Sequence, residues 1–334
     1  MNSKNRKLNF VDLFCGAGGL TLGFENLGFQ NIFSLDCDKY FTETYKFNFP
    51  SHNLLIKKIE GLEKKEISNL INGYKIDVIM GGPPCQGFSL AGKMGRRFID
   101  DPRNYLFKEF IRVVSIVKPN FVVMENVERL YTNKSIRDEI IKLLTKLGYN
   151  VKCEVLNAVH YRVPQNRRRV FFIASLSNKK IIFPRSSINI PKTVKDVIDD
   201  LPKLKSGSKT SISNHESMNH TEQMLKKMSY IKDGGDRFDI PESIRPKSGD
   251  VRKYIRYNSL EPSICITGDM RKVFHYSQNR ALTVRELARI QTFPDNFIFQ
   301  GPKISQQQQV GNAVPPLLAE AVAKAIIEMS EING

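Results

Sequence analysis

The chain has 334 residues, of which 41% are hydrophobic and 25% are charged, the balance of an ordinary globular protein rather than of a disordered one. This length allows for two domains. No apolar run approaches the roughly 18 residues of a membrane span, and no apolar signal core follows the basic N-terminus, so we expect a cytoplasmic protein. The net charge of +17 favours a polyanionic partner such as a nucleic acid, because basic side chains release counterions condensed on phosphates.

The cysteines and histidines give no sign of a metal site or of a disulfide framework. The five cysteines, at positions 15, 37, 85, 153 and 265, are scattered and contain no CxxC pair. His215 and His220 lie five residues apart with no cysteine nearby. We therefore expect no metal.

The first half of the chain alternates short apolar runs with amphipathic stretches, which is typical of an α/β parallel sheet. A glycine follows each predicted helix in the position that favours a left-handed backbone, at Gly28 and at Gly148. The expected strands are 8–14, 31–35, 76–80, 121–124 and 170–175, and the expected helices are 18–27 and 136–147. This order predicts a doubly wound sheet.

The composition changes after about residue 180. Residues 179–278 are polar, rich in Ser, Asn, Lys, Gly and Pro, and too long to be a plain loop. Residues 280–293 return to a helical pattern, and residues 316–329 predict a closing helix with Pro316 in its first turn. We expect one domain over residues 1–180 completed by 305–334, and a second, irregular domain over 181–304.

The first predicted strand runs directly into the glycine-rich segment Phe14-Cys15-Gly16-Ala17-Gly18-Gly19. Glycines between a strand and a helix let a ligand approach the backbone closely. Asp36 ends the second strand, where an acid can hold both hydroxyls of a ribose. The alternative is a tight turn with a capping acid. Because GxGxxG and a phosphate-holding lysine are both missing, an adenosyl cofactor without phosphates fits better than NAD or ATP.

A second glycine-rich segment, Gly81-Gly82-Pro83-Pro84-Cys85-Gln86-Gly87-Phe88-Ser89, follows a buried strand. It stands at the carboxyl end of the sheet, where α/β proteins place their sites. Cys85 is therefore a candidate nucleophile. The alternative is a small buried hydrophobic residue in a rigid turn.

This nonapeptide resembles the catalytic-cysteine motif of DNA (cytosine-5) methyltransferases. Five more segments resemble motifs of that family in the family's order: Phe10–Gly19, Glu125-Asn126-Val127, Gln165–Arg169, Arg285–Asp295 and Gln309–Pro316. Residues from about 180 to 278 fall outside the match, where the family keeps its target-recognition region. The resemblance implies a Rossmann-like S-adenosylmethionine-dependent methyltransferase sheet, a smaller recognition domain, and double-stranded DNA in the cleft between them. It also implies a monomer of bacterial restriction–modification type, with a cognate restriction endonuclease as a partner.

The resemblance implies catalytic roles for four residues. Cys85 matches the nucleophile that adds to carbon 6 of a cytosine flipped out of the duplex, and Glu125 matches the residue at ring N3 and the exocyclic amine. Arg167 and Arg169 match positions near the base and a phosphate, with Arg169 at the cytosine carbonyl oxygen. Arg168 points away from these two by strand alternation and is expected to be solvated.

The resemblance also implies an S-adenosylmethionine site, in which Phe14 packs on adenine, Asp36 holds the ribose, and Leu106 and Asn312 line the pocket. The full expected set is Phe14, Gly16, Gly18, Gly19, Asp36, Cys37, Ile59, Pro84, Leu106, Asn312 and Ala313. Lys57-Lys58-Ile59 departs from the Gly-Asp-Ile that members often carry, whose acid meets the adenine amine.

The expected DNA contacts come from a glycine-containing basic stretch at 89–101, suited to a closing lid, and from the recognition region. Thr267 resembles a threonine that the family places against the DNA backbone, although Gly268 follows it where an aliphatic residue is usual. The set is Gln86, Ser89, Lys93, Arg96, Arg97, Arg103, Gln165, Arg237, Arg256, Thr267, Arg271 and Lys272, with Arg245 and Arg252 as further base-reading candidates.

Two alternatives remain open from the sequence. One branch of the family methylates transfer RNA with the same cysteine motif, so an RNA substrate is the first. A DNA-binding relative that keeps the fold without the chemistry is the second, although the presence of Cys85, Glu125 and Arg169 argues against it.

Overall fold

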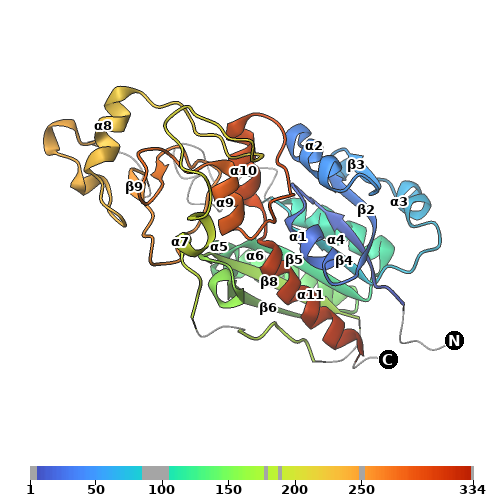
Figure 1. Cartoon of the computed structure of the whole chain (residues 1–334). Helices are drawn as coiled ribbons and strands as arrows, with labels where there is room; N and C mark the ends of the chain where they lie inside the picture. The colour runs from blue at the N-terminus through green and yellow to red at the C-terminus, as the bar shows by residue number, and fades with distance from the viewer. Residues whose placement is uncertain (1–5, 85–104, 177–179, 187–189, 248–252, 332–334) are drawn as a thin grey trace. The chain divides into compact units, whose positions relative to one another are not determined.

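The structure is a computed structural model of the chain that describes residues 6–84, 105–176, 180–186, 190–247 and 253–331 (Figure 1). The chain forms two compact units. The first contains Met1–Asn157, Arg168–Ser186 and Pro316–Gly334. The second contains Ala158–Arg167 and Ser187–Pro315.

A seven-stranded sheet, within the described residues, organises the first unit. Its order is β3-β2-β1-β4-β5-β8-β6; β8 is antiparallel to both neighbours and the other pairs are parallel. The strands are β1 (Asn9–Leu13), β2 (Gln30–Asp36), β3 (Leu54–Ile56), β4 (Val78–Gly81), β5 (Phe121–Val127), β6 (Asn150–Asn157) and β8 (Arg168–Ser175). Because chain order reverses beside β1, the carboxyl ends of β1 and β4 form the switch point where such sheets bind ligands. The predicted doubly wound fold is confirmed.

Helices cover both faces of this sheet. Val11, Leu13 and Val122 pack on one face with buried side chains of the helices that follow β3, β4 and β5. Phe10 points to the opposite face, where its ring lies 6.1 Å from that of Phe24 on the first helix. The helices of the unit are α1 (Gly19–Glu25), α2 (Lys39–Asn48), η2 (Ile59–Gly61), α3 (Lys64–Ile71), α4 (Leu106–Val117), α5 (Glu128–Thr132), α6 (Lys134–Lys146) and α11 (Pro316–Glu331).

The C-terminal helix α11 packs closely on α1, in front of the sheet in Figure 1. The approach depends on Gly23, because a Cβ there would lie 2.4 Å from Ala319 Cβ and 2.6 Å from the carbonyl oxygen of Pro316. The helix thus completes a layer whose other members come from the first half of the chain. The helix predicted for residues 316–329 is α11, and it packs on α1 in this layer.

The second unit is built from short elements and buried polar contacts. Its helices and strands are η6 (Ala158–Tyr161), β7 (Gln165–Asn166), α7 (Val194–Ile198), α8 (Glu222–Tyr230), η7 (Arg237–Asp239), η8 (Glu242–Ile244), β9 (Ile255–Arg256), β10 (Ser263–Ile264), β11 (Val273–Phe274), α9 (Val284–Ile290) and α10 (Lys303–Asn312). Arg280 and Glu286 form a buried ion pair at 2.6 Å, and Glu286 also closes the capping box at the start of α9. Arg285, fully buried, donates to the carbonyls of Ser213, Pro294 and Phe297.

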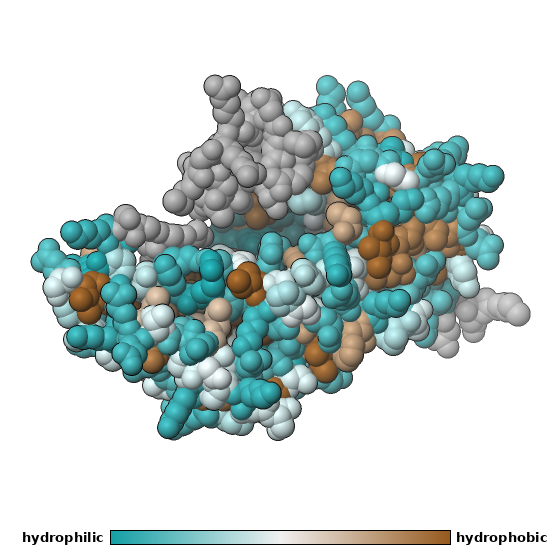
Figure 2. Space-filling model, turned by 90° about the horizontal axis from the view of Figure 1, so that it is seen from above, coloured by the Kyte–Doolittle hydropathy of each residue, from teal (hydrophilic) through white to brown (hydrophobic). Residues whose placement is uncertain are grey.

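The face seen in Figure 2 is mainly hydrophilic, with separate hydrophobic spots. One stretch, Lys303–Glu331, is apolar and long enough to span a membrane by composition. Its apolar window is 61% buried in the protein, and the stretch divides into α10 and α11, so it has the character of core helices. In the part of the chain that the structure describes, no group of three or more His, Cys, Asp or Glu could hold a metal ion.

Candidate active site

The loop after β1 has the backbone that its glycines allow. Gly16 and Gly18 have φ of +56° and +97°, a region that L side chains rarely adopt. A Cβ on Gly18 would lie 2.4 Å from the Phe49 ring. Phe14 also has a positive φ, +61°, and is partly exposed above the core. The segment is therefore a tight turn leading into α1, whose first amides stand at the carboxyl edge of the sheet.

Asp36 closes this loop from the end of β2. Its Oδ2 accepts from the amide of Gly16 at 2.9 Å, and its Oδ1 accepts from the amide of Asp38 at 2.9 Å. Burial raises the pKa of Asp36 above its ordinary value, and the backbone amides that donate to it oppose the rise. The structure thus brings the predicted glycine loop and the predicted ribose acid into direct contact.

The other expected cofactor residues of the first unit lie around the same strands. Ile59 is buried in η2, Leu106 begins α4 against the core, Cys37 is exposed beside Asp36, and Pro84 is partly buried at the last described position before the gap. Lys57, in the departing Lys57-Lys58 pair, forms an ion pair with Glu66 at 2.8 Å. Asn312 and Ala313 belong to the second unit, at the end of α10.

Glu125 and Arg169 meet across two antiparallel strands. Val127 on β5 pairs with Arg169 on β8, so Glu125, two residues earlier, lies diagonally opposite on the same face. Arg169 Nε lies 3.1 Å from Glu125 Oε1, and their side chains are 15% and 10% exposed. Arg168 points to the other face and pairs with Glu128, with a side chain that is 55% exposed. Arg168 and Arg169 therefore face opposite sides of the sheet, and Arg168 is the solvated one, as the sequence predicted.

The segment that leads to Cys85 is tied to the same strand. Asn126 Nδ2 donates to the carbonyl of Pro83 at 2.9 Å. A Cβ on Gly82 would lie 3.1 Å from Glu125 Oε2, so glycine lets this segment pass close to the carboxylate. Asn126 is a positioning residue whose role the Glu125-Asn126-Val127 motif did not reveal from the sequence. The feature of the sequence that could have indicated this role is the position of Asn126 directly after Glu125.

Cys85 itself lies outside the described residues, as do Gln86, Ser89, Lys93, Arg96, Arg97, Arg103 and Arg252. The four described cysteines, Cys15, Cys37, Cys153 and Cys265, form no disulfide with one another. Burial raises the pKa of the Cys15, Cys37 and Cys153 thiols, which makes each a poorer source of thiolate. Cys265 lies 3.6 Å from a nitrogen of Arg167 inside the second unit.

Arg167 was expected near the base and a phosphate, and Gln165 was expected to contact DNA, but the structure buries both side chains. Arg167 is fully buried and donates to the carbonyls of Ile266 and Asn312. Gln165 is fully buried, donates to Gln291 at 2.9 Å and accepts from the amide of Ile266. These contacts hold the second unit together, because a buried polar group needs an internal partner. Strand alternation alone could not show which of the arginines faces inward.

Arg256 also differs from the expectation. It is 6% exposed and donates to the carbonyls of Met228, Ile231, His275 and Gln278 and to the side chain of Asn279. A guanidinium with its fork filled in this way braces the fold and does not read bases. Its basic charge in a basic region gave no sign of this burial.

The remaining recognition candidates lie at or near the surface of the second unit. Arg271 is exposed and paired with Asp269 at 2.9 Å, and Lys272 lies 4.9 Å from the centre of the Tyr254 ring. Arg237 and Arg245 flank the exposed Phe238 ring at 5.3 and 5.4 Å. Thr267 packs its backbone against Gly311, where a Cβ would lie 2.4 Å away. His215 and His220, which we excluded as metal ligands, bond to Thr283 and to the amide of Ala281.

Fold and site together define an α/β protein with a glycine-rich loop at the switch point and a carboxylate–arginine pair beside Gly82, in the segment that leads to Cys85. A sequence model of the C-5 cytosine-specific DNA methylase family matches residues 8–328. The chain is 57% identical to the type II methyltransferase M1.HphI of Haemophilus parahaemolyticus, over 97% of this chain and 87% of that one. It is 34% identical to M.DdeI of Desulfomicrobium norvegicum, over 96% and 88%.

A solved structure described as a DNA modification methyltransferase from an E. coli prophage superposes with a TM-score of 0.80 at 25% identity, covering 97% of this chain and all of that one. The chain therefore belongs to the C-5 cytosine-specific DNA methylase family and is a DNA (cytosine-5) methyltransferase. The family resemblance seen in the six motifs is confirmed.

Proposed function

We propose that this enzyme flips a cytosine out of double-stranded DNA, adds Cys85 to its carbon 6, and methylates carbon 5 from S-adenosylmethionine. The observation that carries the proposal is the Glu125–Arg169 pair, set beside Gly82 in the segment that leads to Cys85. The addition requires a carboxyl group, a fixed cation and a thiol. Glu125 and Arg169 supply the first two at one sheet edge, and Cys85 follows Gly82 by three residues in the sequence.

Carbon 5 of cytosine is too weak a nucleophile to react unaided. Addition of the Cys85 thiolate forms a bond from sulfur to carbon 6 and moves an electron pair toward carbon 5. Glu125 would lie at N3 and the exocyclic amine, where its protonated carboxyl would donate a proton to N3 and so offset the negative charge that the addition places on the ring. Carbon 5 would then bond to the methyl group that S-adenosylmethionine supplies, whose bond to the sulfonium sulfur breaks and leaves a neutral thioether. Loss of the carbon 5 proton to water would finally break the bond between carbon 6 and sulfur and restore Cys85. Arg169 holds Glu125 in place through the 3.1 Å contact.

The described residues fit an adenosyl cofactor. Asp36 is placed for ribose hydroxyls, and the positive-φ glycines leave room for close approach of a ligand. Asp12, beneath the loop, has a buried carboxyl oxygen with no hydrogen-bond partner among the described residues. When bound, S-adenosylmethionine supplies an electrophilic methyl group on a sulfonium. The partly buried Phe14 and Leu106, together with the glycines of the loop, would line the same site.

We further propose that the first unit is catalytic and the second recognises the target sequence. The exposed Arg271 and the partly exposed Arg237 and Lys272 of the second unit, and the +17 charge of the chain, support contact with a polyanion. The names of the relatives, which are type II methyltransferases, support a place in restriction–modification with a cognate endonuclease. A cytoplasmic monomer agrees with that role.

Label transfer from S-adenosylmethionine to unmethylated genomic DNA or to transfer RNA, followed by bisulfite sequencing, tests the proposal. We expect 5-methylcytosine at one short repeated DNA sequence. Label in transfer RNA alone would move the substrate to RNA. Cys85→Ser should abolish transfer and retain DNA binding, whereas active Cys85→Ser would contradict the role of the thiol.

A further inference from the structure

A buried aspartate lies directly beneath the proposed cofactor loop. Asp12 is two residues before Phe14 on β1, and its side chain is fully buried. Its Oδ2 accepts from the Thr21 hydroxyl at 2.6 Å, whereas its Oδ1 has no partner among the residues that the structure describes. A buried carboxylate normally needs a cation or several donors. In the part of the chain that the structure describes, Asp12 has one donor, Thr21.

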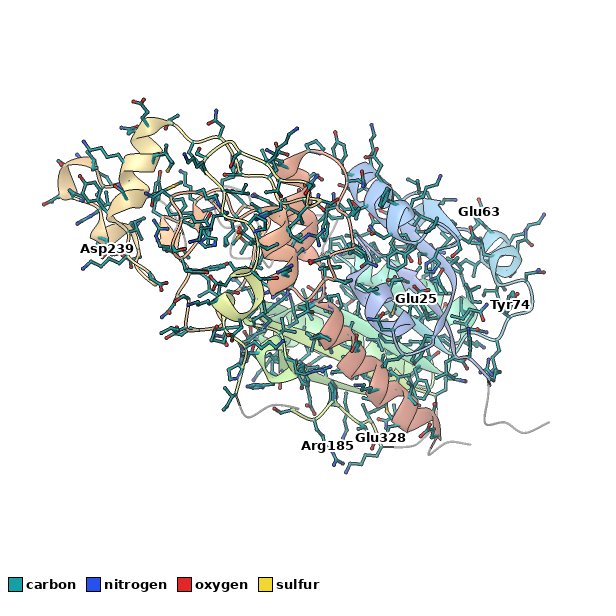
Figure 3. The ribbon with its side chains drawn as sticks, viewed as in Figure 1. Glu25, Glu63, Tyr74, Arg185, Asp239 and Glu328 are labelled. Carbon is teal, nitrogen blue, oxygen red and sulfur yellow. The ribbon has the colours of Figure 1, made fainter. Side chains whose placement is uncertain are left out.

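A chain of hydrogen bonds connects Asp12 to the surface. The Thr21 hydroxyl lies 3.1 Å from the Tyr45 hydroxyl, which lies 3.0 Å from Nδ1 of His52. Nε2 of His52 lies 2.7 Å from Oε1 of Glu25, whose side chain is 29% exposed at the end of α1 (Figure 3). Each intermediate group can both donate and accept, so a proton can pass along the chain in either direction.

The surroundings of Asp12 favour its neutral form. Burial raises the pKa of Asp12 to about 7, the Thr21 hydrogen bond opposes the rise, and the Asp36 carboxylate adds to it. Cys15 and Tyr45, the other titratable groups beside it, are themselves acids whose pKa burial raises well above the ordinary value. A cationic ligand over the loop would supply the counter-ion that these neighbours do not.

We propose that Asp12 responds to the charge of the cofactor: it releases its proton, through Thr21, Tyr45 and His52, when S-adenosylmethionine binds, and regains one when the neutral-sulfur product S-adenosylhomocysteine remains. This inference rests on the proposed cofactor. The two ligands differ by a methyl group and one positive charge, so the ionised Asp12 attracts the sulfonium form more strongly than the product. Asp12 thereby favours substrate over product and assists product release. The proton that leaves Asp12 goes to solvent, and the one that returns comes from it.

Calorimetric titration of the wild-type enzyme in two buffers of different ionisation enthalpy counts the protons. With a pKa of about 7, Asp12 is half protonated at pH 7, so S-adenosylmethionine should release about half a proton and S-adenosylhomocysteine close to none. From pH 8 to pH 6 the affinity for S-adenosylmethionine should fall about tenfold, with no matching fall for the product. Equal proton release with both ligands would overturn the inference.

Asp12→Asn tests the assignment to this residue. The variant should bind both ligands without proton exchange and lose the pH-dependent preference. Asp77→Asn is the matched control, because Asp77 is also fully buried but lies at the opposite end of the sheet, bonded to the amide of Asn9 and the side chain of Asn120. It should leave the proton count unchanged. Unchanged release in Asp12→Asn would overturn the assignment, and wild-type enzyme that binds neither ligand would refute the proposed cofactor itself.

Tyr45→Phe tests the path separately, because it breaks the hydrogen-bond chain and leaves Asp12 in place. Stopped-flow mixing with a pH indicator should show the same final proton count and a release several times slower than in the wild type. An unchanged rate would exclude the path through Tyr45.

Discussion

The contact between α1 and α11 predicts that replacing Gly23 by alanine lowers the stability of the protein, because packing outweighs the helix preference of alanine. Gly23 lies inside α1, where alanine is normally favoured over glycine by about 1 kcal/mol. In this helix, however, an added Cβ would lie 2.4 Å from Ala319 Cβ, 2.6 Å from the Pro316 oxygen and 2.8 Å from the Glu320 nitrogen. Two of these three atoms are backbone, so a side-chain rotation cannot relieve the clash.

Overpacking of this kind costs about 1–3 kcal/mol, and the backbone atoms at Gly23 place it at the upper end. Gly23→Ala should therefore be destabilised by about 1–2 kcal/mol after the helix preference is subtracted. Because α1 follows the cofactor loop directly, the affinity for S-adenosylmethionine should fall as well.

Thermal unfolding and calorimetric titration measure both effects. Gly61→Ala is the control, because a Cβ there would meet only the end of the Lys57 side chain, at 3.7 Å. A stability change of 1 kcal/mol shifts the melting temperature by about 2–4 °C in a unit of this size. If Gly23→Ala melted with or above Gly61→Ala, the close approach of the two helices would be refuted.

Three further predictions concern the site and the second unit. Glu125→Gln should lower kcat about 10²–10⁴-fold with DNA affinity retained, measured by single-turnover transfer and filter binding; wild-type turnover would remove Glu125 from the chemistry. Because the pKa of Asp12 rises from 3.8 to about 7 on folding, its contribution to stability is present at low pH and is lost as the pH rises to 7 and above. The wild type should thus lose about 2–3 kcal/mol from this group between pH 5 and pH 8 in urea unfolding, and Asp12→Asn should lack that slope; parallel curves would argue against it. Arg256→Met should destabilise the second unit by about 3 kcal/mol or more, since it strands buried carbonyls, whereas the exposed Arg271→Ala should cost less than about 1 kcal/mol; equal melting of the two variants would contradict the burial argument.

Five of the buried strands, the doubly wound class of the sheet and the two glycine-rich loops could be predicted from the sequence, because these features depend on local signals. Short apolar runs bounded by turn residues are typical of buried strands, and glycines at 16, 18, 81 and 82 permit the tight backbone turns that follow two of these strands. The short strand β3 and the long edge strand β6 were not predicted. Their residues are only partly buried, so their apolar pattern is weak.

The partners of individual side chains depended on the tertiary structure. Arg167, Arg256 and Arg271 are alike as residues in a basic chain, yet two are buried braces and one is exposed. Whether an arginine is buried depends on carbonyl groups that come from distant parts of the chain, such as the Met228 carbonyl that accepts from Arg256.

The sequence by itself determined the family, the sheet and the chemical groups of the site, since these follow from motifs whose residues are neighbours. Only the tertiary structure joined Glu125 to Arg169, bonded Asn126 to Pro83, and buried Asp12 with one carboxyl oxygen that has no partner within the described ranges. The reason is physical: the charge and the protonation of a buried group are set by what packs around it, and those neighbours come together only when the strands and helices have assembled.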